Sequence, residues 1–264
     1  MKLGISTASY FGKLLTEDSF APIRELGLDV CEVFLTTFSE LSPSFCALIK
    51  ERMQGVRAHS IHTLNTQFEP QLFNLSERTR KDAEVFFRAA LQTARDIGAT
   101  HYTFHGPTRL KKRDDNFNYA VLGARMQELC DIAAEYGVTM CYENVFWAYY
   151  SFPGYFSSLK QYVPSLGACL DIKQAMRSKK PYEKYIEDMA GSIKTVHLCD
   201  YRADGSVCLP GEGVFDFSEL FQRLNDAGFN GVAMLETYAE ENQTQEDLLR
   251  SLDYLRKASR GLLV

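Results

Sequence analysis

Four residues that can bind a metal ion end four successive β-rich runs in the second half of the chain. Glu143 closes Thr-Met-Cys-Tyr-Glu, Asp171 closes Ala-Cys-Leu-Asp, His197 lies in Thr-Val-His-Leu, and Glu236 closes Ala-Met-Leu-Glu. Three carboxylates at one desolvated point would repel each other and raise one another's pKa unless a cation neutralised them. Each residue alone is more often a hydrogen-bonded strand-end group, but the set of four predicts a metal site. Mn²⁺ is the preferred ion for three oxygen ligands and one imidazole, with Mg²⁺, Co²⁺ or Zn²⁺ as alternatives.

Histidines end two of the earlier runs. His62 follows Ala58 and Ser60 at alternate positions, which predicts one inward face for all three, and His105 closes Tyr-Thr-Phe-His. Each imidazole could bind a second metal ion or hydrogen-bond a substrate hydroxyl, and a capped core histidine is the alternative. Strand alternation places His59 on the opposite face.

His101 is expected at the bottom of its run, where we predict a structural role for it as for His59. Glu32, near the end of the second run, is expected either to touch a substrate or to form a salt bridge inside the barrel.

Three further residues are candidates for contact with a ligand. Lys173 lies two positions after Asp171, where it could bind a substrate anion or help to protonate an intermediate; a lysine that extends to solvent is the alternative. Arg109 begins a basic stretch over 109–113 that could bind a phosphate or carboxylate, unless it is a solvated loop. Trp147 belongs to an aromatic loop after Glu143 that could wall or cover a site, or pack against the next helix.

These residues lie on a regular series of elements. Eight β-rich runs alternate with segments of helical periodicity, and several of those segments end at a turn glycine, as at Gly27, Gly98 and Gly228. Strands that alternate with helices at this length predict a (β/α)₈ barrel, a single domain over residues 1–264. The first turn lacks G-x-G-x-x-G, which argues against a dinucleotide-binding fold. The expected strands are 2–6, 30–35, 56–61, 101–105, 139–144, 168–172, 195–199 and 232–236.

Composition limits the partners. The 29 basic and 34 acidic side chains give a formal charge of −5, which argues against a nucleic-acid partner. No apolar stretch approaches the length of a membrane span, which argues against a membrane partner. Seven cysteines without a C-x-x-C pair indicate a reducing compartment, so we expect a cytoplasmic protein. The sequence leaves open whether the protein forms a homo-oligomer.

The ordered set of motifs resembles the xylose isomerase-like TIM-barrel superfamily, which contains sugar and sugar-phosphate isomerases and epimerases and metal-dependent abasic-site endonucleases. The resemblance covers nearly the whole chain. It rests on the following segments: His62, Phe-His-Gly-Pro at 104–107, Tyr-Glu-Asn at 142–144, Leu-Asp-Ile-Lys-Gln-Ala at 170–175, His-Leu-Cys-Asp at 197–200, Leu-Pro-Gly-Glu-Gly at 209–213 and Leu-Glu-Thr at 235–237.

The resemblance implies a division of roles. Glu143 and Glu236 would bind the ion and act as acid and base on opposite faces of an α-hydroxy ketone, while Asp171 and His197 would serve as ligands only. Gln174 stands where both the endonucleases and the free-ketohexose epimerases carry a histidine, so the third metal site of the endonucleases is missing and a free ketohexose is disfavoured.

The sequence therefore predicts a metal-dependent isomerase or epimerase of a small sugar or sugar phosphate. The predicted catalytic residues are Glu143, Glu236 and Lys173, and the predicted substrate-binding residues are His62, His105, Trp147, Gln174 and Arg109. A dehydratase or lyase, a two-metal phosphodiesterase that uses His62 and His105, and a non-enzymatic sugar-binding module are the alternatives.

Overall fold

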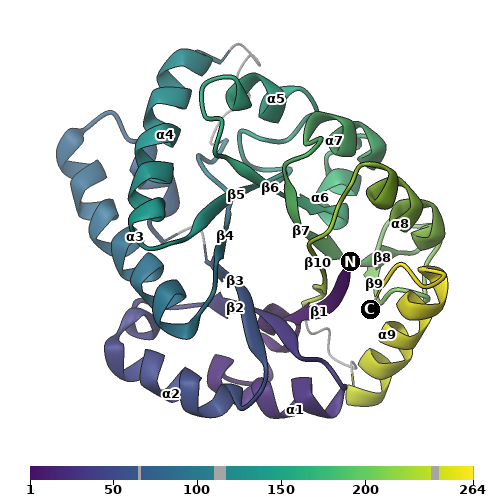
Figure 1. The fold of residues 1–264 in the computed structure, drawn as a ribbon. Helices are drawn as coiled ribbons and strands as arrows, with labels where there is room; N and C mark the ends of the chain where they lie inside the picture. The colour runs from purple at the N-terminus through teal and green to yellow at the C-terminus, as the bar shows by residue number, and fades with distance from the viewer. Residues whose placement is uncertain (65–66, 110–116, 239–243, 264) are drawn as a thin grey trace.

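Eight parallel strands close into a barrel, as the sequence predicts. The computed structural model describes residues 1–64, 67–109, 117–238 and 244–263. Neighbouring strands follow the order β1-β10-β7-β6-β5-β4-β3-β2 around the barrel, and Figure 1 looks down its axis. The strands are β1 (Lys2–Ser6), β2 (Val30–Leu35), β3 (Arg57–Thr63), β4 (His101–Phe104), β5 (Thr139–Glu143), β6 (Gly167–Asp171), β7 (Ile193–Leu198) and β10 (Val232–Leu235).

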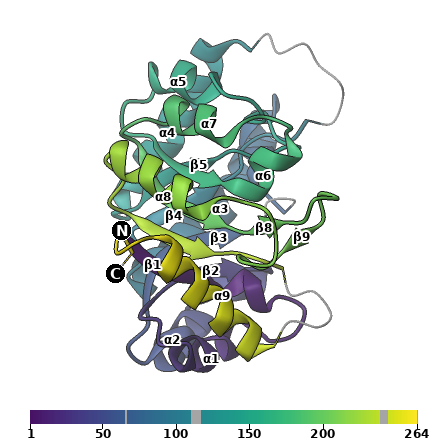
Figure 2. The same cartoon turned by 90° about the vertical axis from the view of Figure 1, so that its right-hand side faces the viewer.

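Helices surround the barrel and connect its strands (Figures 1 and 2). Local capping explains several of their boundaries: the Ser76 and Asp216 side chains accept hydrogen bonds from the first turns of α3 and α8, and Gly98 ends α3 with a positive φ. The α-helices are α1 (Phe20–Glu25), α2 (Pro43–Met53), α3 (Glu77–Ile97), α4 (Tyr119–Glu135), α5 (Tyr155–Lys160), α6 (Ile172–Arg177), α7 (Tyr182–Asp188), α8 (Phe217–Asp226) and α9 (Gln245–Ala258).

Short elements occupy the loops that follow the strands. A two-stranded antiparallel sheet of β8 (Asp200–Tyr201) and β9 (Val207–Cys208) follows β7. The 3₁₀ helices are η1 (Thr7–Tyr10), η2 (Thr16–Asp18), η3 (Phe38–Leu41) and η4 (Glu69–Phe73). Within the described ranges, no helix combines the length and the apolar character that crossing a bilayer requires.

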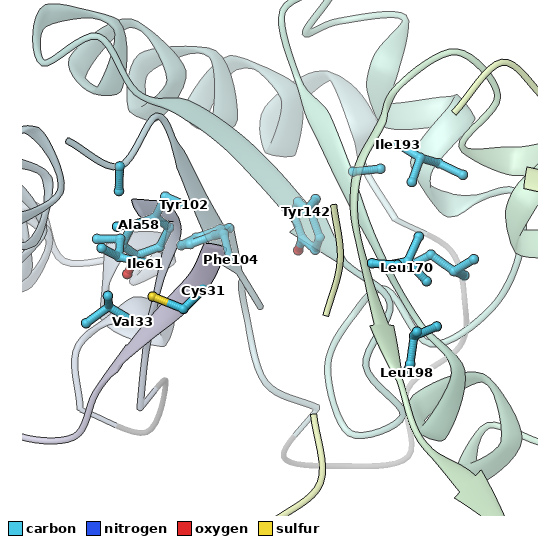
Figure 3. Packing of buried hydrophobic residues seen from close by; sticks show 14 of the residues in the cluster. Cys31, Val33, Ala58, Ile61, Tyr102, Phe104, Tyr142, Leu170, Ile193 and Leu198 are labelled. Atoms are coloured by element: carbon cyan, nitrogen blue, oxygen red, sulfur yellow. The ribbon is translucent and has the colours of Figure 1, made fainter. Parts of the chain in front are cut away.

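The apolar core has two parts. The larger part lies between the strands and the helices, and Figure 3 shows some of it, including Cys31, Val33, Ala58 and Ile61. The smaller part fills the lower interior of the barrel with Val30, Val232 and Met234. The polar residues described below therefore lie above an apolar plug inside a closed ring of strands.

Two β-bulges change which side chains face the barrel interior. The register of β3 against β2 pairs Cys31 with Ala58 and Glu32 with Ser60, so His59 is an extra residue. The predictions for Ala58 and His59 were wrong because of this bulge: Ala58 packs in the outer core, and His59 Nε2 reaches Thr195 Oγ1 at 3.1 Å, on the strand opposite β3 in the barrel.

The second bulge lies on β7. Ala168 pairs with Ile193 and Cys169 pairs with Thr195, which leaves Lys194 as the extra residue. The two bulges therefore occur on opposite strands near the beginnings of those strands, and each adds one polar residue at the N-terminal end of the barrel.

Candidate active site

The four predicted ligands meet at the carboxyl end of the barrel. Glu143 and Asp171 are the last residues of β5 and β6, His197 lies near the end of β7, and Glu236 directly follows β10; each is at most 2% exposed. His197 Nδ1 lies 3.0 Å from Glu143 Oε1, 3.2 Å from Glu236 Oε2 and 3.7 Å from Asp171 Oδ2. One imidazole nitrogen is thus surrounded by three carboxylates.

Hydrogen bonds between side chains and the backbone hold these strand ends in place. The Asn144 side chain donates to the Asp171 carbonyl at 2.9 Å and accepts from the Asp171 N–H at 2.8 Å, which ties the end of β5 to the end of β6. The Ser9 hydroxyl donates to the Leu235 carbonyl and accepts from an N–H just beyond Glu236. Asp171 Oδ1 caps α6 by accepting from the Gln174 N–H at 2.7 Å.

Three buried carboxylate oxygens in this cluster, Glu143 Oε2, Asp171 Oδ2 and Glu236 Oε1, have no hydroxyl or backbone N–H donor among the described residues. Their nearest basic neighbours are His105 Nε2 at 3.1 Å, His197 Nδ1 at 3.7 Å and His62 Nδ1 at 3.4 Å, respectively. Buried charge requires a counter-ion or donors. One donor atom from each of Glu143, Asp171, His197 and Glu236 can be chosen so that all four lie within 4.8 Å of one another. These residues therefore fit a divalent metal ion.

Lys173 contributes a buried positive charge beside these carboxylates. Its ammonium lies 3.4 Å from Glu236 Oε2, 4.0 Å from Asp171 Oδ2 and 4.7 Å from the centre of the Tyr238 ring. Burial lowers the pKa of Lys173, but Glu236 and Asp171 outweigh that effect and raise it. One ammonium does not balance the carboxylates that surround it, so the cluster still has room for a cation.

His62 and His105 form a pair beside the tetrad. Their Nε2 atoms are 2.8 Å apart, and His105 Nε2 lies 3.1 Å from Glu143 Oε2. The opposite nitrogen of each ring faces a buried carboxylate: His62 Nδ1 is 3.2 Å from Glu32 Oε1, and His105 Nδ1 is 3.2 Å from Glu69 Oε2. Burial lowers the pKa of His62, but hydrogen bonds with Glu236 and Glu32 outweigh burial and raise it to about 10.

Glu32 lies inside the barrel beneath the tetrad and is fully buried. Its carboxylate accepts hydrogen bonds from the hydroxyls of Ser6, Ser60 and Thr103 at 3.2, 2.8 and 2.7 Å. His197 Nε2 lies 3.1 Å from Glu32 Oε1. Of the two roles expected for Glu32, the structure supports the one inside the barrel, as a support for imidazoles; it does not line the pocket described below.

Glu69 is a residue of the site that sequence reasoning missed. It belongs to η4, is fully buried, and accepts hydrogen bonds from the Tyr102 hydroxyl at 2.7 Å, the Thr63 hydroxyl at 2.9 Å and the His105 N–H at 3.0 Å. No strand periodicity identifies this residue, because it lies on a short turn in a loop. Its carboxylate fixes both the backbone and the ring of His105.

A pocket of about 460 Å³ opens above the tetrad. Arg109, Trp147 and Gln174, three of the predicted substrate contacts, line it together with His62 and His105. The other residues around it are Phe34, Thr63, Leu64, Thr108, Glu143, Lys173, Arg177, Glu236 and Tyr238.

Sequence reasoning missed three pocket residues, Phe34, Arg177 and Tyr238, although strand alternation could have identified two of them. Phe34 and Tyr238 stand two residues beyond Glu32 and Glu236, on the same alternating face. Arg177 stands four residues after Lys173 on α6, and its guanidinium lies 5.6 Å from the centre of the Phe146 ring. These residues add two aromatic surfaces and a second arginine to the pocket.

The aromatic loop after Glu143 divides into two parts. Trp147 faces the pocket, with its ring 5.5 Å from that of His105. Tyr150, Tyr155 and Phe156 are buried in a separate aromatic cluster outside the strands. Most of the basic stretch at 109–113 lies outside the described residues, so only Arg109 can be placed; its guanidinium donates to the Ser151 hydroxyl at 3.0 Å.

The fold and this site define a class: a (β/α)₈ barrel whose strand ends bring carboxylates and imidazoles together beneath one pocket. The family model described as xylose isomerase-like TIM barrel matches residues 20–258. The chain belongs to this family. An uncharacterized protein of Methanocaldococcus jannaschii is 24% identical over 273 residues, which cover 97% of this chain and 89% of that protein.

Solved structures share the fold at low sequence identity. A D-tagatose 3-epimerase-like protein is 22% identical with a TM-score of 0.81, covering 99% of this chain and 98% of its own. D-psicose 3-epimerase from Clostridium cellulolyticum H10 is 17% identical with a TM-score of 0.80, and the coverages are 98% and 99%. The IOLI protein with a bound zinc atom is 18% identical with a TM-score of 0.80, again with coverages of 98% and 99%.

Proposed function

We propose that this protein is a metal-dependent isomerase or epimerase of a small sugar or sugar phosphate, folded as one barrel domain over residues 1–264. The observation that carries the proposal is the buried tetrad of Glu143, Asp171, His197 and Glu236, whose three carboxylates converge on one imidazole nitrogen beneath an open pocket. The likeness in fold to sugar 3-epimerases supports the substrate class.

The tetrad would hold a divalent ion, and Mn²⁺ suits its three oxygen donors and one nitrogen donor. Zn²⁺ is the first alternative, since a protein of the same fold binds it. Mg²⁺ and Co²⁺ are the others. When bound, the ion supplies positive charge that stabilises the negative charge developing on the substrate oxygens during proton transfer.

Glu143 and Glu236 perform the proton transfer in this proposal. They approach His197 from β5 and from the end of β10, and both line the pocket, whereas Asp171 and His197 do not. One glutamate takes the proton from the carbon next to the carbonyl, and the other returns a proton to the opposite face. Return to the same carbon gives an epimer. Return to the former carbonyl carbon, together with transfer of the hydroxyl proton to the former carbonyl oxygen, gives an aldose–ketose shift.

Lys173 is the third catalytic residue of the proposal. Its buried ammonium beside Glu236 holds a developing oxyanion or donates a proton to it. His62 and His105 bind substrate hydroxyls in this proposal, because both rings line the pocket while Glu32 and Glu69 hold their Nδ1 atoms. Trp147, Gln174 and Arg109 contact the remainder of the substrate, and Arg109 would receive a phosphate group.

Metal analysis and solvent isotope exchange test this function. The purified protein is expected to bind one divalent ion per chain and, with Mn²⁺ added, to incorporate one solvent deuterium at carbon during turnover of a pentose, a hexose or one of their phosphates. A protein that binds no ion with micromolar affinity, or turns over a substrate without deuterium incorporation, would contradict the proposal. Its cytoplasmic location and the absence of nucleic-acid and membrane partners stay predictions, and a homo-oligomer stays open.

One observation favours a second candidate, a two-metal phosphodiesterase. His62, His105 and Glu143 offer donor atoms that lie close enough together to hold another ion. This arrangement would give two ions per chain and hydrolysis of a model phosphodiester without deuterium transfer to carbon. The dehydratase or lyase alternative shares the first proton abstraction but releases water or a fragment, which product analysis distinguishes from isomerisation.

A further inference from the structure

A second cavity lies at the opposite end of the barrel from the proposed active site. Its volume is about 240 Å³, roughly eight water volumes at about 30 Å³ each. His101 is the first residue of β4, Lys194 is the second residue of β7, and Gly231 directly precedes β10. The cavity therefore lies at the N-terminal ends of the strands. We call this cavity the floor cavity; its other lining residues are His59, Gly191, Ile193, Ala227, Gly228, Phe229 and Asn230.

Both β-bulges of the barrel contribute to the floor cavity. His59 is the extra residue of β3, and Lys194 is the extra residue of β7. Bulges are commonly found where a side chain must be redirected toward a site. Two bulges on opposite strands that both supply polar groups to one cavity are difficult to explain by packing alone.

Glycines make room for the Lys194 segment. A Cβ at Gly167 would lie 3.2 Å from Lys194 Cγ, and a Cβ at Gly231 would lie 2.0 Å from the Lys194 carbonyl oxygen. A larger residue at Gly231 would therefore displace the Lys194 backbone. The local sequence is thus compatible with holding a lysine at this end of the barrel.

Lys194 is the lysine that lines the floor cavity, and Arg57 and Lys160 lie outside its lining. Arg57, Lys160 and Lys194 act electrostatically on the two imidazoles or on one another. Within the described ranges, none of these three side chains has a carboxylate oxygen within 4.0 Å, and the lining contains no acidic residue. Exposed lysines and arginines elsewhere, such as Arg88 and Lys184, do form ion pairs.

The two imidazoles add neutral hydrogen-bonding groups. The rings of His59 and His101 stack with centroids 4.4 Å apart, and His101 Nδ1 lies 2.9 Å from the Thr100 hydroxyl. Burial lowers the pKa of both histidines, and Arg57 lowers it further. Lys194 also lowers the pKa of His101, whereas Glu32 acts in the opposite direction on His59. An anion in the cavity would relieve the repulsion among these groups.

From the cavity, its two bulge residues and the lysine that lines it without a carboxylate partner among the described residues, we propose that the floor cavity binds a small oxyanion of the phosphate class. Lys194 provides the charge, and the Asn230 side chain provides a hydrogen bond. The site is separate from the proposed active site, which lies at the other end of the strands, and the proposal does not depend on the proposed function.

Phosphate binding to the wild-type protein is the first test. Inorganic phosphate at about ten times its dissociation constant is expected to raise the unfolding temperature by about 3 °C relative to chloride at equal ionic strength. The imidazole carbon–proton spectrum contains only five histidines. The signals of His59 and His101 are expected to shift with phosphate, whereas a shift confined to His62, His105 or His197 would overturn the proposal.

Variants locate the bound anion. Lys194→Met is expected to lose the temperature shift, and Lys50→Met, which removes an exposed lysine of α2, is expected to keep it. A shift that survives in Lys194→Met, or one that disappears in Arg177→Gln at the other end of the barrel, would overturn the proposal. A comparison of inorganic phosphate with glycerol 3-phosphate identifies the chemical form of the bound anion. Tighter binding of inorganic phosphate indicates free phosphate, tighter binding of glycerol 3-phosphate indicates a phosphomonoester, and either result supports the site.

Discussion

The same two strands carry a histidine pair at each end of the barrel, and the two pairs have opposite electrostatic surroundings. His62 and His105 lie at the carboxyl end with ring centroids 4.6 Å apart, and His59 and His101 lie at the amino end with centroids 4.4 Å apart. Burial opposes protonation of both pairs. Carboxylates overcome it at the carboxyl end and raise the pKa of His62 and His105, whereas at the amino end burial prevails and the pKa of His59 and His101 is lowered.

The difference shows that position in a strand does not determine what a buried histidine can do. The residues that end the neighbouring strands determine it, because they decide which charge surrounds the ring. At the carboxyl end the carboxylates of Glu32, Glu69, Glu143 and Glu236 surround the imidazoles, and the site favours cations. At the amino end Arg57 acts on both rings and Lys194 acts on His101, and the proposed floor cavity would take an anion.

Removal of an acid–base group at the carboxyl end should give the largest effect. Glu236→Gln is expected to lower kcat by about 10³-fold, since general acid–base catalysis contributes roughly 10²–10⁴-fold and one metal donor is weakened as well. The measurement is solvent deuterium incorporation together with metal content. Glu135→Gln, which removes a surface carboxylate of α4, should keep full activity. Unchanged turnover in Glu236→Gln would show that the tetrad does not perform the chemistry.

The buried lysine of the carboxyl end should have the next largest effect. Lys173→Met is expected to lower kcat/KM by about 100-fold, because Glu236 and Asp171 lose their nearest ammonium and the substrate loses a cation. Lys173→Arg keeps the charge and should restore KM more than kcat. Lys50→Met is the matched surface control. If Lys173→Met retained kcat/KM, Lys173 would be removed from the mechanism.

Strand alternation predicted the tetrad because three of its members end a strand or directly follow one and His197 is the second-last residue of β7. At these positions a closed barrel leaves little freedom in the direction of a side chain. The barrel itself follows from the same regular alternation of strands and helices. His59 and Ala58 were placed wrongly because a bulge depends on the register against β2, which local sequence does not encode.

The amino end can be tested through stability rather than activity. The pKa of His59 is lowered to about 4, from 6.5 in the unfolded chain, so the unfolded state binds the extra proton first as the pH falls. The contribution of His59 to stability is complete above pH 6.5 and decreases down to pH 4, by about 2 kcal/mol at pH 5.

Urea unfolding at pH 7 and pH 5 in phosphate-free buffer measures this loss. His59→Gln keeps a hydrogen-bonding side chain but cannot titrate, so its stability should fall by about 2 kcal/mol less than that of the wild type over this interval. An equal loss in both proteins would mean that His59 is not held neutral, and the electrostatic contrast between the two ends would then be weaker than the structure indicates.

Glu69 shows what sequence patterns leave out of the site. It comes from η4 and holds the backbone and ring of His105 from 36 positions away in the chain. Neither its neighbours in sequence nor any alternation marks it. The contact exists because the loop after β3 folds back beneath β4, and that path is a property of the whole barrel.

The smallest expected effect at the carboxyl end therefore belongs to this positioning residue. Glu69→Gln keeps the shape but removes the charge that orients His105, and loss of such a supporting carboxylate commonly costs about tenfold. Because His105 is proposed to bind the substrate, KM should rise more than kcat falls. Glu40→Gln, which neutralises a buried carboxylate of η3, is the control for folding. A drop in kcat alone would move His105 from substrate binding to proton transfer. No change in either constant would leave the carboxylate behind His105 with a structural role.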